Sequence, residues 1–508
     1  WMQAPGNDLL GVRFSTESPE ANAIYILNLK ELSSVAAQFE RRDVMVESSG
    51  AGGWHRSFDL FKPCEDLLLA FGVNLMDPHL SHYSIAGGRK YDYAQTLSDH
   101  SRWWELYRPH ADHVARVIAL QKEAEEYNRV LVLHPTTTAW MYHQPQGYPW
   151  KGSDHDLRLK AMAGSHPAFV LDLYLNRIDF DLGDECLLEE TGAVREGHFV
   201  VGAREYDIVV IPPDLETLSW QNQVLLENWL EAGGRVLEAG SAFQRVDGRI
   251  SDKPATMRER YRDQWERFDS VDRMLQCLIT EVPPRFATAS PEPEDRRLIW
   301  RRSVLPGGEE LYFFCNPWET PLNTSLRAAE GGWIELDTET GEWVGVAVPS
   351  GDGDFEIPLD LPPRGHRFLL RTRSLEAYPT HPKRREREDA PLALRFVGTN
   401  LQGENLLNVA HCDFETNGKV LSDVPTVVAD RKNWAWQGFP CSPWVMTADM
   451  RPFEGDIDRV TIPPQSAMQI CYRFEIAENL TEAERSAIEL GVKRPWLYGI
   501  PINDQDTG

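Results

Sequence analysis

A short apolar run that ends on a carboxylate and opens into glycines is the feature that most restricts the fold of this chain. Residues 44–46 (Val-Met-Val) are followed by Glu47 and then by the turn-forming residues 48–53. A run of this length between turn signals is typical of a strand buried on both faces. In an α/β barrel, the residue at the carboxyl end of such a strand faces the active site. Glu47 is therefore the first candidate for a catalytic residue; the alternative is a carboxylate that caps a helix or lies in a loop.

A second apolar run follows after a segment with helical spacing. Apolar residues recur at helical intervals over residues 57–70, and residues 71–76 form the next run. Strand, helix and strand in this order predict two parallel strands whose carboxyl ends meet at one edge of a sheet. We therefore expect the polar rings that follow the two runs to lie near Glu47; they are Trp54, His79, His82 and Tyr83.

These segments resemble a known family of enzymes. The residues that carry the resemblance are Val46-Glu47-Ser48-Ser49-Gly50-Ala51-Gly52-Gly53-Trp54, Gly72-Val73-Asn74, Pro78-His79-Leu80-Ser81, Gly88-Arg89-Lys90 and Asp92-Tyr93. Their order is similar to the end of the catalytic barrel of bacterial glycoside hydrolases, nearest to family 106, the α-L-rhamnosidases. The clan that includes the β-galactosidases shares part of the pattern. The resemblance covers about the first quarter of the chain.

The resemblance implies a fold and a reaction. It implies a (β/α)8 barrel whose last two strands are present here, so that the chain starts inside the barrel, which normally needs about 250 residues. It also implies that Glu47 is one of two carboxylates that cleave a glycosidic bond. In family 106 it would be the general base of an inverting reaction, and in a β-galactosidase the nucleophile of a retaining one. The second carboxylate is expected before Trp1; Glu17 and Glu20 are the candidates within the chain.

Aromatic and imidazole side chains suit a sugar substrate, because flat rings stack on sugar C–H faces while their polar atoms form hydrogen bonds. The expected subsite residues are Trp54, Trp103 and Trp104, and the expected hydroxyl-binding residues are His79, His82 and Tyr83. The alternative for the Trp103–Trp104 pair is packing of the last barrel helix against the next domain. No cofactor is required, but the resemblance implies a bound calcium ion. No Asp/Asn-rich loop of EF-hand spacing is present, so no calcium ligands are assigned.

Composition restricts the partners. A formal charge of -26 and a pI near 5.0 argue against nucleic acid and anionic membranes, which both require a basic face. No run of about 18 apolar residues predicts a membrane span. The seven cysteines are dispersed, odd in number and without a CxxC pair, so they indicate neither a disulfide framework nor a zinc site. A neutral carbohydrate is the expected substrate.

Residues 129–285 show a second pattern, in which apolar strands alternate with helices from Val130 to Gly240. This alternation predicts a doubly wound parallel sheet. The turn after Ile211 holds two prolines and no cysteine nucleophile, and the first strand is followed by His134-Pro135 instead of GxGxxG. The segment resembles the degenerate amidotransferase-like module that follows the barrel in several glycosidase families. That resemblance implies packing against the barrel and oligomerisation, not chemistry.

The remaining residues are rich in strands separated by turn signals. The predicted organisation is α/β followed by β: the end of a barrel over residues 1–128, the amidotransferase-like domain over 129–285, a small β-sandwich over 286–373, a charged linker over 374–390 and a truncated galactose-binding-like β-sandwich over 391–508. The predicted function is glycoside hydrolysis. The alternatives are a noncatalytic carbohydrate-binding protein with a decayed barrel and, weakened by the missing cysteine, a stand-alone amidotransferase-like enzyme. The sequence leaves the compartment open.

Overall fold

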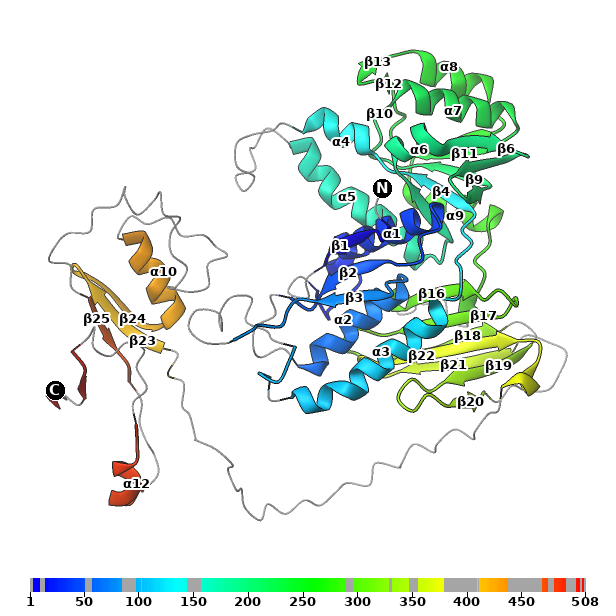
Figure 1. Ribbon diagram of the computed structural model, residues 1–508. Helices are drawn as coiled ribbons and strands as arrows, with labels where there is room; N and C mark the ends of the chain where they lie inside the picture. The colour runs from blue at the N-terminus through cyan, green and yellow to red at the C-terminus, as the bar shows by residue number, and fades with distance from the viewer. Residues whose placement is uncertain are drawn as a thin grey trace. The chain divides into compact units, whose positions relative to one another are not determined.

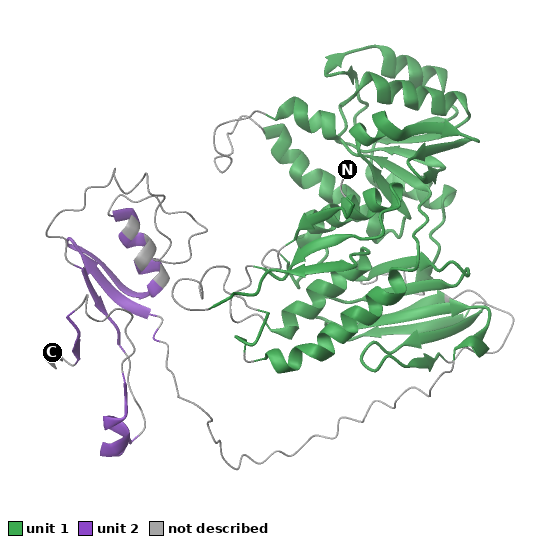
Figure 2. Cartoon of the chain, viewed as in Figure 1, with its two compact units in different colours: residues 1–391 green, residues 392–508 purple. Residues whose placement is uncertain are grey.

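The chain divides into two compact units, Trp1–Pro391 and Leu392–Gly508, seen in the computed structural model (Figures 1 and 2). The structure describes residues 3–9, 14–50, 57–84, 97–101, 103–143, 157–288, 296–328, 331–346, 355–378, 409, 411–436, 468–473, 479–489, 499–502 and 505–506. Trp54 and most of the charged linker predicted over residues 374–390 lie outside these ranges.

The first sheet of unit 1 has three parallel strands in the order β1-β2-β3. The strands are β1 (Gly6–Asp8), β2 (Met45–Ser48) and β3 (Leu75–Pro78), joined by η2 (Glu20–Asn22), α1 (Ala23–Gln38) and α2 (Phe58–Ala70). The run predicted to carry Glu47 is β2, and the sequence does not predict β1. Three parallel strands in chain order with helical crossovers are compatible with part of a (β/α)8 barrel, and the closed barrel stays a prediction.

A five-stranded parallel sheet follows, in the order β14-β11-β9-β4-β5, as the alternation of strands and helices predicts. Its apolar strands divide their side chains between two cores, because successive residues point to opposite faces. In β4, Val130 and Val132 join one buried cluster, and Leu131 and Leu133 join the other. Its strands are β4 (Val130–Leu133), β5 (Phe180–Gly183), β9 (Ile208–Ile211), β11 (Arg235–Ala239) and β14 (Trp265–Phe268).

The other helices and short strands of this region surround the sheet, except η4 and α3, which lie beside α2 (Figure 1). The helices are η4 (Trp104–Leu106), α3 (Tyr107–Gln121), α4 (Thr136–Tyr142), α5 (Leu157–Leu175), α6 (Glu185–Thr191), α7 (Trp220–Glu231), α8 (Lys253–Arg260) and α9 (Val271–Glu281). The strands are β6 (Gly192–Arg195), β7 (His198–Val201), β8 (Arg204–Tyr206), β10 (Thr217–Leu218), β12 (Arg245–Val246) and β13 (Arg249–Ile250).

Two antiparallel sheets complete unit 1, with strand orders β16-β17-β22-β19-β20 and β15-β18-β21. Their buried residues belong to the same core cluster, which makes them the two layers of a β-sandwich. The strands are β15 (Ala287–Thr288), β16 (Ile299–Val304), β17 (Glu310–Cys315), β18 (Leu322–Ala328), β19 (Gly332–Leu336), β20 (Trp343–Gly345), β21 (Phe355–Leu361) and β22 (His366–Thr372), followed by η7 (Leu375–Ala377).

Buried hydrogen bonds join these parts of unit 1. Leu182 at the edge of the five-stranded sheet is held by α1: its N–H donates to Ser34 Oγ at 2.9 Å, and its carbonyl accepts from Gln38 Nε2 at 2.9 Å. Tyr174 of α5 stacks on Trp300 of β16, with ring centroids 5.2 Å apart, and its hydroxyl bonds the N–H and carbonyl of that residue. The sheets therefore share one core.

Unit 2 has a three-stranded antiparallel sheet in the order β24-β23-β25, and the helix α10 packs on it through a small core of Cys412, Phe414 and Ala429. The second β-sandwich stays a prediction. The elements are β23 (His411–Thr416), β24 (Lys419–Pro425), α10 (Thr426–Trp436), β25 (Met468–Cys471), α12 (Glu482–Ser486), β26 (Pro501–Ile502) and β27 (Gln505–Asp506). Within the described ranges of both units, no helix has the length and apolar character needed to cross a membrane.

Candidate active site

Glu47 lies near the carboxyl end of β2, the central strand of the first sheet. The strand alternates: Val46 and Ser48 are fully buried, whereas Met45 and Glu47 are partly exposed on the other face. The β1–β2 register pairs Asp8 with Glu47, and the β2–β3 register pairs Glu47 with Asp77. Register partners in a parallel sheet share a face, so three carboxylates stand in a row at the strand spacing of about 4.8 Å. No sequence pattern marks Asp8 and Asp77 as site residues, because strand pairing brings them beside Glu47.

His79 lies beside this row. Its Nε2 is 3.6 Å from Glu47 Oε1, and the Glu47 side chain is 35% exposed, compared with 19% for His79. The backbone N–H of His79 donates to the Ser48 carbonyl at 2.8 Å, which extends the β2–β3 ladder by one residue. The structure thus brings together Glu47 and His79, which the sequence predicts to be neighbours, with Glu47 accessible to a ligand.

A buried carboxylate supports the turn that follows Glu47. Ser49 adopts the left-handed conformation with φ 63°, which is uncommon for a residue other than glycine. Its hydroxyl donates to Glu65 Oε1 at 3.2 Å, and the other oxygen of Glu65 lies 2.7 Å from His110 Nε2. Ser49, Glu65 and His110 are all buried. The helices α2 and α3 therefore fix the backbone two residues after Glu47.

The two tryptophans expected in the subsites lie just before α3, with Trp104 in η4 and Trp103 directly before it. Trp103 packs against Phe58 and Phe61 of α2, with ring centroids 5.5 and 5.3 Å apart. Trp104 stacks on Tyr107 at 5.3 Å and is 38% exposed. These contacts join Trp103 to α2, inside the segment predicted as the end of the barrel, so they do not test the alternative of packing against the next domain. The role of Trp103 as a subsite residue stays a prediction, as does that of Trp104.

The other predicted residues are more dispersed. Tyr83 is fully exposed and His82 is partly buried, in the segment after β3. Glu17 and Glu20 are exposed in the connection from β1 to α1. Because this connection leaves the carboxyl end of β1, it lies on the same side of the sheet as Glu47. Trp54 falls outside the described residues.

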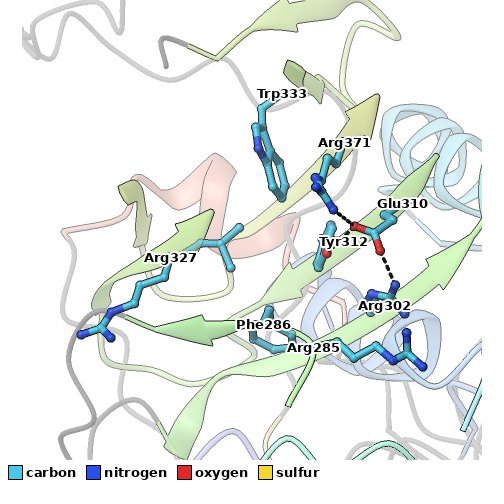
Figure 3. A pocket seen from close by; sticks show the side chains of 9 residues that line it. Arg285, Phe286, Arg302, Glu310, Tyr312, Arg327, Trp333 and Arg371 are labelled. Atoms are coloured by element: carbon cyan, nitrogen blue, oxygen red, sulfur yellow. Dashed lines mark hydrogen bonds and ion pairs between the residues drawn. The ribbon is translucent and has the colours of Figure 1, made fainter. Parts of the chain in front are cut away.

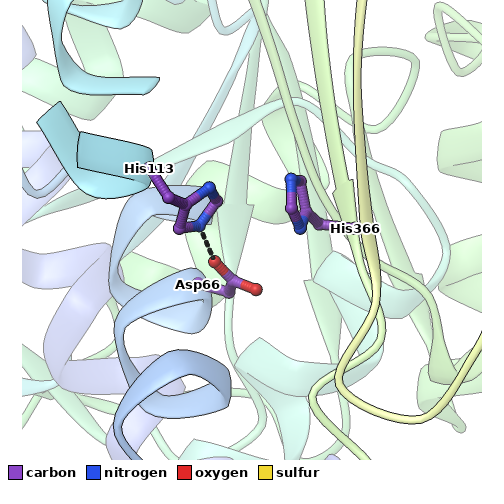
Figure 4. Close-up of side chains that lie close together, drawn as sticks. All are labelled: Asp66, His113 and His366. Atoms are coloured by element: carbon purple, nitrogen blue, oxygen red, sulfur yellow. Dashed lines mark hydrogen bonds and ion pairs between the residues drawn. The ribbon is translucent and has the colours of Figure 1, made fainter. Parts of the chain in front are cut away.

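A second cluster has the composition of a metal site: Asp66 of α2, His113 of α3 and His366 of β22 (Figure 4). Lys62 already supplies a cation there. Its ammonium lies 2.5 Å from Asp66 Oδ2, 2.9 Å from His366 Nδ1 and 2.8 Å from the Arg364 carbonyl. These three acceptors match the three N–H donors of a lysine. The Lys62 ammonium thus takes the place that a metal ion would need. Calcium also does not match the residues, because calcium prefers oxygen ligands and two of the three residues are histidines.

The Lys62 contact fixes the direction of a closed chain of hydrogen bonds. An ammonium only donates, so His366 Nδ1 accepts and its Nε2–H donates to Thr338 Oγ1 at 2.6 Å. The Thr338 hydroxyl then donates to His113 Nδ1 at 2.8 Å, and His113 Nε2–H donates to Asp66 Oδ1 at 2.7 Å. Burial alone would raise the pKa of Asp66, but Lys62 and His113 hold it well below its usual range. The network ties α2 and α3 to the β-sandwich.

The carboxyl edge of the five-stranded sheet is where doubly wound folds bind ligands, between strands whose connections run in opposite directions. Here that edge is closed between β4 and β9, because Thr138 Oγ1 accepts from the N–H groups of Glu216 at 3.0 Å and Thr217 at 3.3 Å. Beside it, Glu185 is buried and accepts from the N–H and hydroxyl of Thr137. Burial raises the pKa of Glu185 to about 7 despite these bonds.

Comparisons with known proteins agree with this geometry at the level of the fold. No known protein-family model and no curated protein matches the sequence. A rhamnosidase from Novosphingobium sp. PP1Y matches in structure with a TM-score of 0.52 and 16% identity, over 82% of this chain and 37% of its own. A GH42 β-galactosidase from G. stearothermophilus gives a TM-score of 0.47 and 12% identity, over 72% of this chain and 59% of its own. The β-galactosidase from Rahnella sp. R3 gives a TM-score of 0.47 and 11% identity, over 72% of this chain and 60% of the β-galactosidase chain. The chain thus spans between about a third and three fifths of these proteins, and the similar solved structures are glycoside hydrolases.

Proposed function

We propose that this protein is a glycoside hydrolase in which Glu47 is one of the two catalytic carboxylates. The observation that carries the proposal is the position of Glu47: it is partly exposed near the carboxyl end of the central strand of three parallel β/α units, beside His79. This is the edge at which barrel enzymes place catalytic residues. The fold similarity to a rhamnosidase supports the reaction class by analogy.

The site supports two roles for Glu47. A carboxylate next to the anomeric carbon either attacks it or activates a water, and the separation of the two carboxyl groups decides between retention and inversion. His79, 3.6 Å away, orients Glu47 and bonds substrate hydroxyl groups. An α-L-rhamnoside is the first proposed substrate and a β-D-galactoside the second. The resemblance to family 106 implies a calcium ion, but the cluster of Asp66, His113 and His366 does not fit one, because two of its three residues are histidines.

The test is hydrolysis of a panel of aryl glycosides, led by α-L-rhamnoside and β-D-galactoside, by the protein and its Glu47→Gln variant. We expect the variant to lose about 10²–10⁴-fold in rate, the usual contribution of a general acid or base, with unchanged folding. Glu40→Gln is the matched control, because Glu40 is exposed in the turn before β2, at the opposite edge of the sheet. Near-normal turnover in Glu47→Gln would contradict the assignment.

The same panel of aryl glycosides also tests the identity of the partner carboxylate and the alternative function. Asp8→Asn and Asp77→Asn test the neighbours in the row, and Glu17→Gln and Glu20→Gln test the connection from β1. The anomeric configuration of the first product, followed by NMR, distinguishes inversion from retention. Saturable glycan binding without turnover of any glycoside would instead favour the noncatalytic carbohydrate-binding protein.

A further inference from the structure

Ion pairs formed by arginine keep their charge at any ordinary pH. In the β-sandwich, for example, Arg302 and Arg371 both bind the carboxylate of Glu310 (Figure 3). The pair between His134 and Glu31 is different, because an imidazole gains or loses its proton between pH 5 and pH 8. His134 directly follows β4 of the five-stranded sheet and Glu31 lies on α1, so this pair joins two parts of unit 1.

The hydrogen bonds around His134 fix a proton on its Nδ1. Asp184 caps α6, where its Oδ1 accepts from the backbone N–H groups of Cys186 and Leu187. Its Oδ2 accepts from the Thr136 hydroxyl at 3.1 Å. Since that hydroxyl gives its single proton to the carboxylate, its oxygen can only accept from His134 Nδ1, which lies 3.0 Å away. His134 therefore carries a proton on Nδ1.

The other ring nitrogen of His134 needs a proton as well. Its Nε2 lies 3.1 Å from Oε1 of Glu31. An ionised carboxylate only accepts hydrogen bonds, so Nε2 must donate to it. An imidazole with both nitrogens protonated is a cation. The two contacts can therefore exist together only while His134 is positively charged, and the neutral ring can keep only one of them.

The exposure of Glu31 decides which contact the neutral ring gives up. The Glu31 side chain is 39% exposed, so water can take the place of the imidazole at its carboxylate. The contact with Thr136 is anchored instead, because the Thr136 hydroxyl is tied to Asp184 and Asp184 is tied to the start of α6. The neutral ring therefore keeps its bond to Thr136 and releases Glu31.

Two further titratable groups among the described residues act on His134. The ring of His166, from α5, stands edge to face with the His134 ring, with centroids 5.1 Å apart. Burial and the charge of His134 lower the pKa of His166 to about 3, so His166 stays neutral where His134 titrates. Glu185 of α6 interacts electrostatically with His134. Its negative charge favours the charged imidazole and moves the release of Glu31 to higher pH.

We propose that His134 is a pH-sensitive link between the five-stranded sheet and α1, closed while its imidazole is charged and open at Glu31 when the ring is neutral. On opening, the Nε2 proton passes to solvent and water hydrates the Glu31 carboxylate. The helix α1 is the element before β2. The closed link therefore ties the segment that leads to Glu47 to the five-stranded sheet at acidic pH. The link does not depend on the proposed hydrolysis.

Nitrogen NMR of protein labelled at its histidine side chains tests the proton positions, with His134 assigned from the His134→Gln variant. We expect both ring nitrogens to be protonated at pH 5, and the ring at pH 8 to be neutral with its proton on Nδ1. Thr136→Val removes the acceptor, so the neutral ring should lose its preference for Nδ1–H. His198, whose Nδ1 lies 3.1 Å from Asp207, is the internal control and should not respond to Thr136→Val.

The NMR result can overturn the proposal in three ways. A His134 ring that is neutral at pH 5 would show that the two contacts do not require a cation. A ring that is still charged at pH 8 would show that the link does not open in this range. A neutral ring with its proton on Nε2 would show that Thr136 does not hold the ring.

Thermal unfolding tests the contact with Glu31. We expect Glu31→Gln to lower the thermal midpoint by about 1–2 °C at pH 5, as for a partly exposed ion pair, and to leave it unchanged at pH 8, where the parent has already lost the contact. Glu123→Gln is the matched control, because Glu123 pairs with Arg42, whose charge is constant, so its effect should be the same at both pH values. An equal effect of Glu31→Gln at pH 5 and pH 8 would overturn the proposal.

Discussion

At the scale of single residues, Ser49 shows how the protein fixes the backbone after Glu47. Its left-handed conformation is costly for a side chain with a Cβ, and its bond to Glu65 offsets that cost. We expect Ser49→Ala to lower the free energy of unfolding by about 1 kcal/mol, because it loses the bond and keeps the strain. Ser49→Gly loses the same bond but relieves the strain, so it should be the more stable of the two. Urea denaturation measures both; a less stable glycine variant would contradict this account.

The buried carboxyl group of Glu185 predicts how the stability of the protein depends on pH. Its pKa of about 7 lies above the ordinary value of 4.5, so between these values the folded state binds more protons than the unfolded state. Stability should therefore fall as the pH rises from 4.5 through 7, by up to about 3 kcal/mol. Glu185→Gln has no proton to lose, so its stability relative to the parent should increase over that window. Denaturation at pH 5 and pH 8 checks this, and parallel pH profiles would refute it.

At the scale of elements, the Lys62 network holds α2 and α3 on the β-sandwich. Lys62→Met removes the cation and leaves the buried carboxylate of Asp66 and Nδ1 of His366 without their partner. We expect a loss of about 3–5 kcal/mol in the free energy of unfolding, the usual cost of breaking a buried ion pair. Lys122→Met is the control, since Lys122 is about as exposed as Lys62 but pairs with Asp43, which is 42% exposed, compared with 1% for Asp66. Equal effects of the two substitutions would show that the network adds no special stability.

The elements also show what the sequence could predict. The sequence predicts the strands β2 and β3 and the helix α2, because their apolar runs and helical spacing are local features. It does not predict the strand β1, since Gly6–Asp8 has no apolar pattern and becomes a strand by pairing with β2. Glu65 sits among apolar residues of α2, and its partners Ser49 and His110 come from other elements. In the same way, no spacing in the sequence places Glu31 beside His134.

At the scale of the whole molecule, the sheets of unit 1 share a core that includes β1–β3, one face of the five-stranded sheet and the β-sandwich. We therefore expect unit 1 to unfold in one cooperative transition. Glu185→Gln in the five-stranded region and Lys62→Met at the β-sandwich should then shift the same calorimetric peak. Two peaks that respond separately to the two substitutions would show that the parts unfold independently.

The alternation along β2 limits how sequences related to this one can change in length. Met45 and Glu47 lie on one face of the strand, and Val46 and Ser48 on the other. Deleting one residue within the strand before Glu47 would exchange the faces, burying the carboxylate against the helices and exposing a valine. A deletion of two would restore the alternation. In contrast, β4 is apolar on both faces, so the same single deletion there would exchange one aliphatic residue for another. Insertions and deletions should therefore be rarer in β2 than in β4 over evolution.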